Sequence, residues 1–247
     1  YLVNPKSTVV KSIYVDESQA WISPACYEKT VFGANSFVIF SDRSGYSHLY
    51  RYSYGGGQLG QLTHGNYDVT AYYGTGADGS VYYQSTGGDP LNRVVSMIDR
   101  KGRVVDLSPS EGTASATFSP AMNYYSMTYS NVKEPPVQTL YTSAGKKVRV
   151  LEDNAAYRSS LPAMSAKEFF TFSTDGQTLN GYMIKPQGYS ASKKYPEIMT
   201  QNSGPGSQSV LNRWSLDWEQ YFATKGYIII CVDGRGTGGR GRAFMDV

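Results

Sequence analysis

Residues 195–236 read YPEIMTQNSGPGSQSV, LNRWSLDWEQYFATKG and YIIICVDGRG. Two short apolar runs in this stretch, 197–200 and 227–232, are bounded by Gly and Pro, which predicts two β-strands. Between them apolar residues recur at helical spacing, and Gly226 follows as a helix stop. The apolar residues of the predicted helix are Leu211, Trp214, Trp218, Tyr221 and Phe222. A strand, a helix and a strand in this order predict a right-handed crossover into a parallel sheet.

Two loops, 201–209 and 233–241, follow the predicted strands, and ligands bind at the carboxyl ends of parallel strands. Both loops contain several Gly residues, which suits tight turns and a close approach of the backbone to a ligand. The run GRGTGGRG at 234–241 raises nucleotide binding as an alternative. Neither GxxxxGK[ST] nor GxGxxG followed by a helix and a distal acid occurs, so we expect no cofactor.

The segments YPEIMTQNSGPGSQ and IIICVDGRGTGGRG closely resemble the opening of the catalytic domain in the prolyl oligopeptidase family of serine peptidases, within its dipeptidyl peptidase IV branch. In that branch the first loop has a Tyr, a small residue and Gly-Pro, and the second has Asp-Gly-Arg-Gly, then Ser or Thr, then Gly. Residues 233–238 match in full and residues 203–205 in part. The resemblance implies that the intact protein removes dipeptides, preferably with Pro at the second position, from peptide amino termini.

The composition is that of an ordinary globular protein, with 247 residues, 40% apolar residues, 17% charged residues and a net charge of +3. No Lys/Arg run exceeds two residues, so we expect no nucleic-acid partner. The 22 Tyr and 26 Gly favour many short strands joined by tight turns. The two cysteines, Cys26 and Cys231, lack metal-ligand spacing, and Cys231 lies in an apolar run as a small buried residue.

A repeat with a period in the forties runs through the N-terminal half. Apolar runs precede Ser41, Ser85 and Ser130, which are 44 and 45 residues apart. A second series is in register with the first: Gly57, Gly102 and Gly145, with Leu62, Leu107 and Leu151. Several strands per unit at this period are typical of propeller blades, which we place at about 19–65, 66–112 and 113–154. A β-sandwich is the alternative. The resemblance favours the propeller, because relatives of this kind carry eight blades before the hydrolase domain.

The predicted fold class is therefore mixed. Residues 1–154 are expected to form the C-terminal blades of an incomplete propeller, preceded by two short strands joined at 4–6. Residues 155–247 are expected to form the first part of an α/β-hydrolase domain that ends before the nucleophile. Residues 154–163 are expected to be a linker broken by Pro162, followed by two strands around Asp175-Gly176, a strong hairpin signal.

A serine hydrolase of this fold needs a Ser on a G-x-S-x-G elbow, then an acid and then a His along the chain. No such elbow occurs after residue 165, and the two histidines, His48 and His64, precede the hydrolase-like segment in predicted blade loops. We therefore expect the Ser, Asp and His of the triad to lie outside this sequence, and the chain to be inactive alone.

Asn202 is the candidate site residue. It occupies the position at which the resemblance implies a Tyr hydroxyl that stabilises the oxyanion, so it departs from the pattern. Its amide could donate to an oxyanion, or it could serve as a turn former ahead of Ser203-Gly204. The resemblance implies that Asp233 and Arg235 hold loops together by ion pairing. Glu152-Asp153 is interpreted as a solvated face rather than an acid/base pair.

Two alternatives stay open at this stage. The protein could be a prolyl tripeptidyl or acylaminoacyl peptidase of the same family, or a non-catalytic binding protein with a decayed site. No Glu-Glu pair of the kind that binds the substrate amino terminus occurs in the sequence. Secretion to the periplasm, medium or cell surface of a bacterium is expected, a homodimer and membrane attachment are left open, and the unpaired sheet edges predict that the isolated chain associates.

Overall fold

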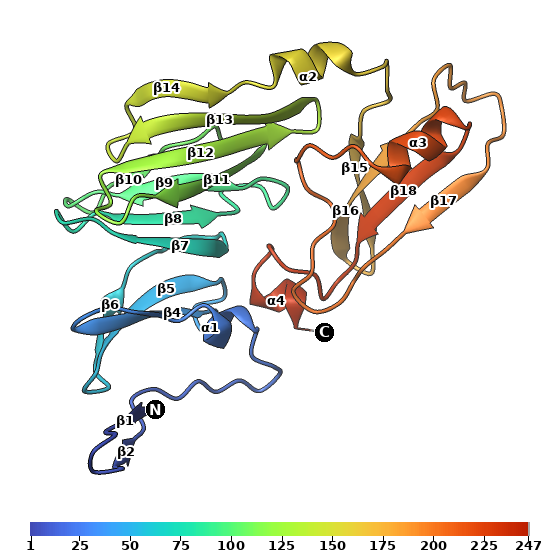
Figure 1. Ribbon diagram of the computed structural model, residues 1–247. Coiled ribbons are helices and arrows are strands. Elements are labelled where there is room, and N and C mark those ends of the chain that lie inside the picture. The colour runs from blue at the N-terminus through green and yellow to red at the C-terminus, as the bar shows by residue number, and fades with distance from the viewer. Residues whose placement is uncertain (247) are drawn as a thin grey trace.

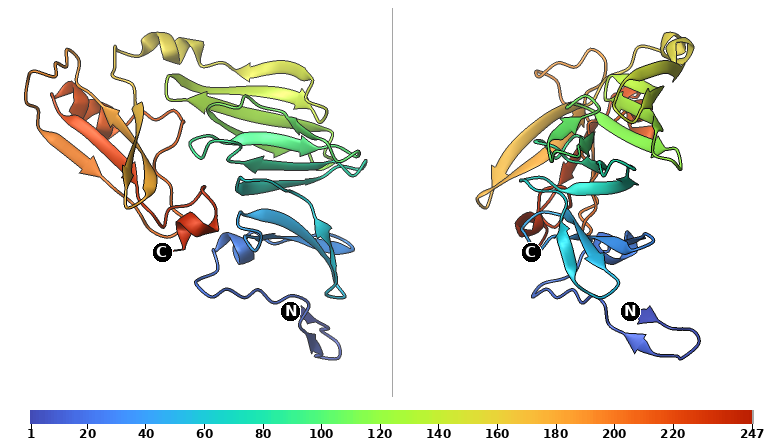
Figure 2. Two further views of the ribbon diagram at one scale, coloured as in Figure 1. Left: turned by 180° about the vertical axis from the view of Figure 1, so that it is seen from behind. Right: turned by 90° about the vertical axis from the view of Figure 1, so that its left-hand side faces the viewer.

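The computed structural model describes residues 1–246, whose strands form one two-stranded hairpin and four four-stranded sheets. Figures 1 and 2 show three of these sheets stacked in chain order, with the fourth sheet beside the stack. The hairpin, β1 (Leu2–Val3) and β2 (Val10–Lys11), projects from the N-terminal end of the stack. It corresponds to the two short strands predicted at the start of the chain.

Each sheet of the stack has four strands that follow one another in the sequence and pair antiparallel. Blade one follows the short helix α1 (Ala25–Glu28) and contains β3 (Val31–Phe32), β4 (Ser36–Ser41), β5 (His48–Ser53) and β6 (Gln58–Gln61). Blade two contains β7 (Val69–Thr75), β8 (Val81–Ser85), β9 (Val94–Ile98) and β10 (Val104–Asp106). Blade three contains β11 (Thr113–Phe118), β12 (Tyr124–Asn131), β13 (Glu134–Thr142) and β14 (Lys147–Glu152). A repeated four-stranded meander of this kind is the unit of a β-propeller.

The residues of the sequence repeat occupy equivalent places in the blades. Ser41, Ser85 and Ser130 each lie at or next to the end of the second strand of a blade, and all three are buried. The repeated glycines lie in the turn between the third and fourth strands: Gly57, Gly102 and Gly145. Since the same turn recurs at the same place, the period marks one blade.

The hydrophobic core of the stack lies between blades. One cluster joins blades one and two: Val38, Phe40, Leu49, Val69, Val81 and Tyr83. A second joins blades two and three: Val95, Ala114, Tyr125 and Met127. In both clusters a blade buries a face against the next blade along the chain, which is the behaviour of a repeat protein.

The fourth sheet has the strand order β15-β16-β18-β17. Its strands are β15 (Glu168–Thr174), β16 (Gln177–Ile184), β17 (Glu197–Thr200) and β18 (Ile228–Asp233). The hairpin of β15 and β16 turns at Asp175 and Gly176, which both have positive φ, as the Asp-Gly signal predicts. β17 and β18 pair parallel, with the crossover helix α3 (Trp218–Thr224) between them in the chain. The predicted fold class is confirmed: about three propeller blades precede the N-terminal part of an α/β-hydrolase.

The crossover helix is shorter than the apolar spacing predicts. It begins at Trp218, and Asp217 caps it by accepting a hydrogen bond from the Glu219 N–H at 3.0 Å. Residues 210–217 are not helical because blades two and three hold them: the Asn212 N–H donates to the Leu91 carbonyl at 2.8 Å, and its side chain accepts from the Val132 N–H at 3.2 Å. Contacts with the blades therefore override the local helical period.

The segment between the blades and the hydrolase sheet, predicted as a linker at 154–163, contains one short helix. This helix is α2 (Ala155–Ser160), whose first N–H donates to the Asp153 carboxylate at 2.8 Å. Pro162 follows the helix end, where it cannot continue the helix.

Candidate active site

The two Gly-rich loops leave the same edge of the hydrolase sheet. β17 and β18 are parallel neighbours in register from Glu197 and Ile228 to Thr200 and Cys231, so their carboxyl ends coincide. The loop 201–209, called the first loop here, follows β17, the third strand of the sheet. The loop 233–241, called the second loop, follows β18. In α/β-hydrolases the loop after the third strand contributes a donor to the oxyanion hole.

The buried carboxylate of Asp233 joins the two loops. Its two oxygens accept hydrogen bonds from the backbone N–H groups of Ser209 and Val210, each at 2.9 Å. Burial raises the pKa of this carboxyl, and the two amides oppose that shift. The expected ion pairing is wrong: among residues 1–246 Asp233 has no ion-pair partner, and Arg235 donates to the Ala243 carbonyl. Backbone amides, rather than a cation, hold the loops together here.

Backbone contacts between the glycines complete the junction. The Gly206 N–H donates to the Gly236 carbonyl at 3.1 Å, and the Gly238 N–H donates to the Ser207 carbonyl at 2.9 Å. A Cβ on Gly238 would lie 2.8 Å from the Gly206 carbonyl oxygen, closer than atoms approach. Gly236 and Gly238 of GRGTGGRG thus contact the first loop directly, and the Gly238 N–H is engaged by the Ser207 carbonyl.

Asn202 is exposed on the first loop. Its Oδ1 accepts a long hydrogen bond of 3.4 Å from the Gly204 N–H, and its carbonyl accepts one of 2.8 Å from the Ser207 hydroxyl. The first contact is the local bond expected of a turn former. Its Nδ2 group donates to no acceptor among residues 1–246, so the bonding of this side chain is compatible with both roles.

A cavity of about 390 Å³ opens beside Asn202, bordered by α3, β16 and the end of β17. Its wall contains a buried charged cluster: Glu219 accepts from the Lys167 ammonium at 2.9 Å and from the Tyr182 hydroxyl at 2.5 Å. Burial raises the pKa of the Tyr182 hydroxyl. Sequence reasoning missed this cluster, because its members come from a loop, a helix and a strand with no shared motif. Burial also raises the pKa of Cys231 nearby, so its thiol is an inert core group.

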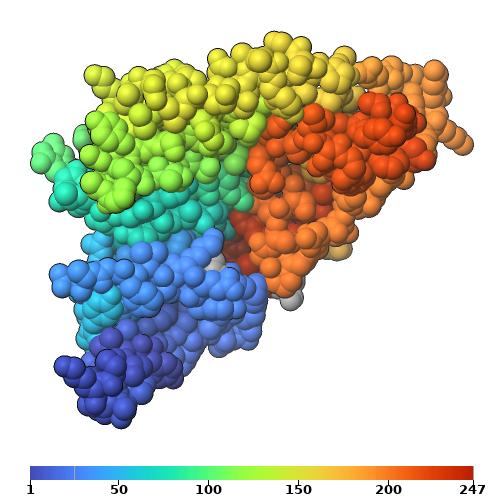
Figure 3. Space-filling model, viewed as in Figure 1, coloured from blue at the N-terminus to red at the C-terminus, as the bar shows by residue number. Residues whose placement is uncertain are grey.

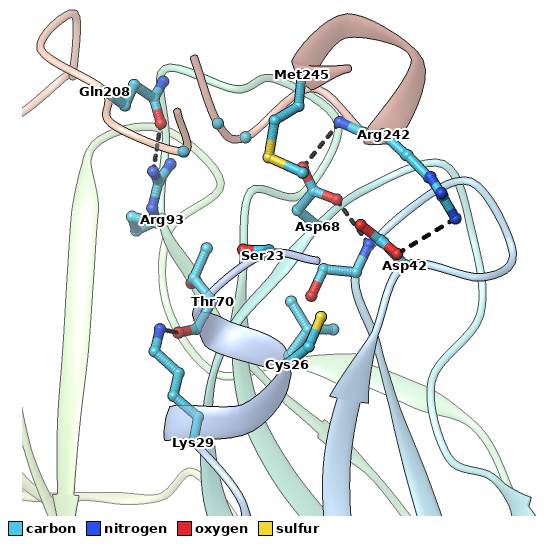
Figure 4. Close-up of a pocket in the computed structure, with 16 residues that line it drawn as sticks. Ser23, Cys26, Lys29, Asp42, Asp68, Thr70, Arg93, Gln208, Arg242 and Met245 are labelled. Carbon is cyan, nitrogen blue, oxygen red and sulfur yellow. Dashed lines mark hydrogen bonds and ion pairs between the residues drawn. The ribbon is translucent and has the colours of Figure 1, made fainter. Parts of the chain in front are cut away.

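Blade residues hold both loops from the opposite side, around a second cavity of about 160 Å³ (Figure 4). The Asp68 carboxylate accepts from the N–H of Ser47 in blade one and from the N–H of Gly241 in the second loop, each at 2.8 Å. Arg242 in α4 (Arg242–Met245) forms ion pairs with Asp42 and Asp246. Figure 3 shows the C-terminal segments, in orange and red, lying directly against the blades. The candidate site is therefore built jointly by the blades and the hydrolase sheet.

The remaining candidate residues lie away from these loops. His48 is not in a blade loop as expected but in β5, where its buried ring contacts the Thr63 hydroxyl and the Gly65 carbonyl. His64 is exposed in the loop between β6 and β7. Glu152 and Asp153 are both exposed, as predicted for a solvated face. Among residues 1–246 no group of three or more His, Cys, Asp or Glu side chains is placed to hold a metal ion.

Propeller blades joined to the first strands of an α/β-hydrolase sheet, with a Gly-Pro loop after the third strand, define a propeller-bearing hydrolase. Comparison with known proteins narrows this class. Residues 1–136 match the family described as the dipeptidyl peptidase IV N-terminal region, and residues 214–247 match the prolyl oligopeptidase family. The chain belongs to the dipeptidyl peptidase IV branch of the prolyl oligopeptidase family.

Individual relatives agree with this assignment. The crystal structure of Porphyromonas gingivalis dipeptidyl peptidase 4 is 42% identical with a TM-score of 0.92, over 98% of this chain and 35% of that one. Dipeptidyl peptidase 4 of Arthroderma otae is 31% identical over 93% of this chain and 32% of its own length. The corresponding Trichophyton rubrum protein is 30% identical with the same coverages, 93% and 32%. The chain spans under a third of these fungal relatives.

Proposed function

We propose that the full-length protein is a serine exopeptidase that removes X-Pro dipeptides from the amino termini of peptides. The observation that carries the proposal is the pair of joined loops at the carboxyl ends of β17 and β18, one bearing Ser203-Gly204-Pro205 and the other Asp-Gly-Arg-Gly. The names of the relatives, which are dipeptidyl peptidases, support it. The Ser, Asp and His triad is proposed to come from outside this sequence, and the chain of 247 residues is proposed to be inactive alone.

Asn202 is proposed to donate to the oxyanion from its free amide group. A donor aimed at the developing negative charge stabilises the transition state more than the substrate, and removing one such donor costs about 10²–10³ in kcat. The long contact with Gly204 uses only Oδ1, so a donor role and a turn role can coexist.

The test uses the full-length protein with Gly-Pro and Ala-Pro chromogenic amides. Asn202→Asp keeps the oxygen that accepts from Gly204 but replaces the donor group, and Asn202→Tyr introduces the hydroxyl that the family pattern has. We expect Asn202→Asp to lower kcat by about 10² or more and Asn202→Tyr to retain or raise it. Unchanged kcat in Asn202→Asp would leave Asn202 as a turn former only. A folded full-length protein that hydrolyses neither amide would overturn the peptidase proposal.

Specificity and cellular context belong to the same proposal. A dipeptidyl enzyme hydrolyses Ala-Pro amides and leaves amides of amino-blocked peptides and of tripeptides ending in Pro largely intact, which separates it from acylaminoacyl and tripeptidyl peptidases.

Its peptide substrates suit a periplasmic, secreted or cell-surface enzyme of a bacterium, and the bacterial relative in Porphyromonas gingivalis supports that source. No helix within residues 1–246 has the length and apolar character that a bilayer crossing requires. A homodimer of the full-length protein is tested by light scattering.

A further inference from the structure

The side chain of Gln208, near the end of the first loop, is bonded across the junction to blade two. Its Oε1 accepts a hydrogen bond of 2.5 Å from the Arg93 guanidinium (Figure 4), and its Nε2 donates to the Pro90 carbonyl at 2.7 Å. The amide therefore uses its donor and its acceptor on two residues of one blade segment. Such a two-point contact fixes the orientation of the side chain as well as its position.

Arg93 is itself held rigidly. Its guanidinium also donates to the carbonyls of Pro90 and Asn92, at 3.1 and 2.7 Å. Its backbone N–H donates to the Gly112 carbonyl and its carbonyl accepts from the Ala114 N–H, each at 2.9 Å, which joins blades two and three. Burial lowers the pKa of the guanidinium to about 10, so it stays charged at neutral pH. Among residues 1–246 it has no ion-pair partner, and it donates instead to two backbone carbonyls and to the neutral amide of Gln208.

The contact continues along the first loop toward Asn202. Gln208 lines both cavities. It shares the wall of the 160 Å³ cavity with Arg93 and the wall of the 390 Å³ cavity with Asn202. The adjacent Ser207 hydroxyl contacts the carbonyls of Asn202 and Gly204, at 2.8 and 2.6 Å. Gly239 of the second loop leaves room for the Gln208 side chain because it has no Cβ. A Cβ at this position would lie only 2.8 Å from the Gln208 Oε1. A displacement of Gln208 would therefore move the segment that carries Asn202.

We propose that Arg93 is a positioning residue for the oxyanion loop: from blade two it holds Gln208 and thereby sets the position of residues 202–207. The inference rests on the proposed peptidase function for its catalytic consequence. It assigns the blade a role in the rate of the chemical step rather than in substrate binding alone.

The kinetic test compares four variants of the full-length protein on Ala-Pro chromogenic amide: Arg93→Met, Arg93→Lys, Gln208→Met and the double variant Arg93→Met/Gln208→Met. A small displacement of a positioned group can cost about 10²-fold in rate, so we expect Arg93→Met to lower kcat by about 10–100-fold with KM within about threefold. Arg93→Lys, which keeps one donor, restores part of kcat. The double variant should be no slower than the slower single variant, because both single changes already break the bond between Arg93 and Gln208.

A matched control is Arg51→Met, since Arg51 also makes a bond between blades, from its guanidinium to the Thr75 hydroxyl at 3.0 Å, away from the loops. We expect its kcat to equal that of the unaltered protein. An Arg93→Met variant that keeps full kcat would overturn the inference, whether or not it loses as much thermal stability as Arg51→Met.

A second readout does not depend on catalysis. Hydrogen exchange measured by mass spectrometry should be faster in peptides covering 201–209 of Arg93→Met, and unchanged there in Arg51→Met. Unchanged exchange in Arg93→Met would refute the inference whatever the activity. The unaltered protein could be folded but inactive while Arg93→Met still shows faster exchange. This result would refute the peptidase proposal but would leave the positioning role of Arg93 in place.

Discussion

The blades and the loop junction are stabilised by contacts of different range. The loop junction here means the contacts of the first and second loops with each other and with the blades. Within a blade each strand pairs with the strand next to it in the sequence, as β4 pairs with β5 and β12 with β13. At the junction, Gln208 bonds to a residue 115 positions away and Gly241 to one 173 positions away. The blades also bury large apolar clusters, whereas the junction depends on a few buried polar groups and close glycine contacts.

The blades and the loop junction should therefore differ in how well they tolerate substitutions. A lost contact inside a blade leaves many neighbours that still cover the same core. A lost acceptor at the junction leaves buried N–H groups that water cannot reach, and each such group is costly. Substitutions at the junction should therefore have larger effects than chemically similar ones in a blade.

The largest effect is expected for Asp233→Ala. It removes the acceptor of two backbone N–H groups, those of Ser209 and the fully buried Val210. Hydrogen bonds to charged groups contribute about 1.5–3 kcal/mol each, so we expect the free energy of unfolding to fall by about 3 kcal/mol or more. Urea unfolding measures this change.

Asp99→Ala is the matched control in a blade. Its half-buried carboxylate also accepts two backbone N–H groups, those of Lys101 and Arg103, and pairs with the Arg103 guanidinium. These donors lie in an exposed local turn, where water can replace the carboxylate. A clearly smaller loss is expected. Equal losses for Asp99→Ala and Asp233→Ala would contradict the distinction between junction and blade.

A second, smaller effect is expected for Gly238→Ala. The new Cβ would lie 2.8 Å from the Gly206 carbonyl oxygen, which is backbone and cannot rotate away, so the loops must separate. Overpacking of this kind costs about 1–3 kcal/mol, and thermal unfolding should report it. Gly88→Ala, where no atom lies within 4 Å of the added Cβ, should leave the midpoint unchanged. A stable Gly238→Ala protein would show that the glycine contact is dispensable.

The same contrast explains which features the sequence predicts. The blades follow from a repeat in which Ser41, Ser85 and Ser130 mark equivalent strand ends. The hairpin at Asp175-Gly176 and the parallel pair β17 and β18 follow from local turn and strand patterns. These features need only neighbours in the sequence, so local chemistry suffices to predict them.

The features that sequence reasoning missed are long-range. The predicted helix is present but begins at Trp218 rather than near residue 211, because Asn212 is bonded to two blades. The Arg93 contact with Gln208 and the cluster of Lys167, Tyr182 and Glu219 join segments that share no motif. Asn202 could be placed on the first loop through the motif around it, whereas the side-chain contacts that hold this loop required the structure.

The smallest effect is expected for the pH dependence of stability, and it comes from His48 in blade one. Burial lowers the pKa of His48 from its ordinary value of 6.5, so the folded state keeps the ring neutral while the unfolded chain takes up a proton. The stability it contributes is complete above pH 6.5 and is lost as the pH falls from there toward the lowered folded pKa, by at most about 1.4 kcal/mol per pH unit. Denaturant unfolding between pH 7.5 and 5 should show this slope, and His48→Gln should reduce it. A slope that persists unchanged in His48→Gln would contradict its assignment to this buried ring, which lies 2.9 Å from both the Thr63 hydroxyl and the Gly65 carbonyl.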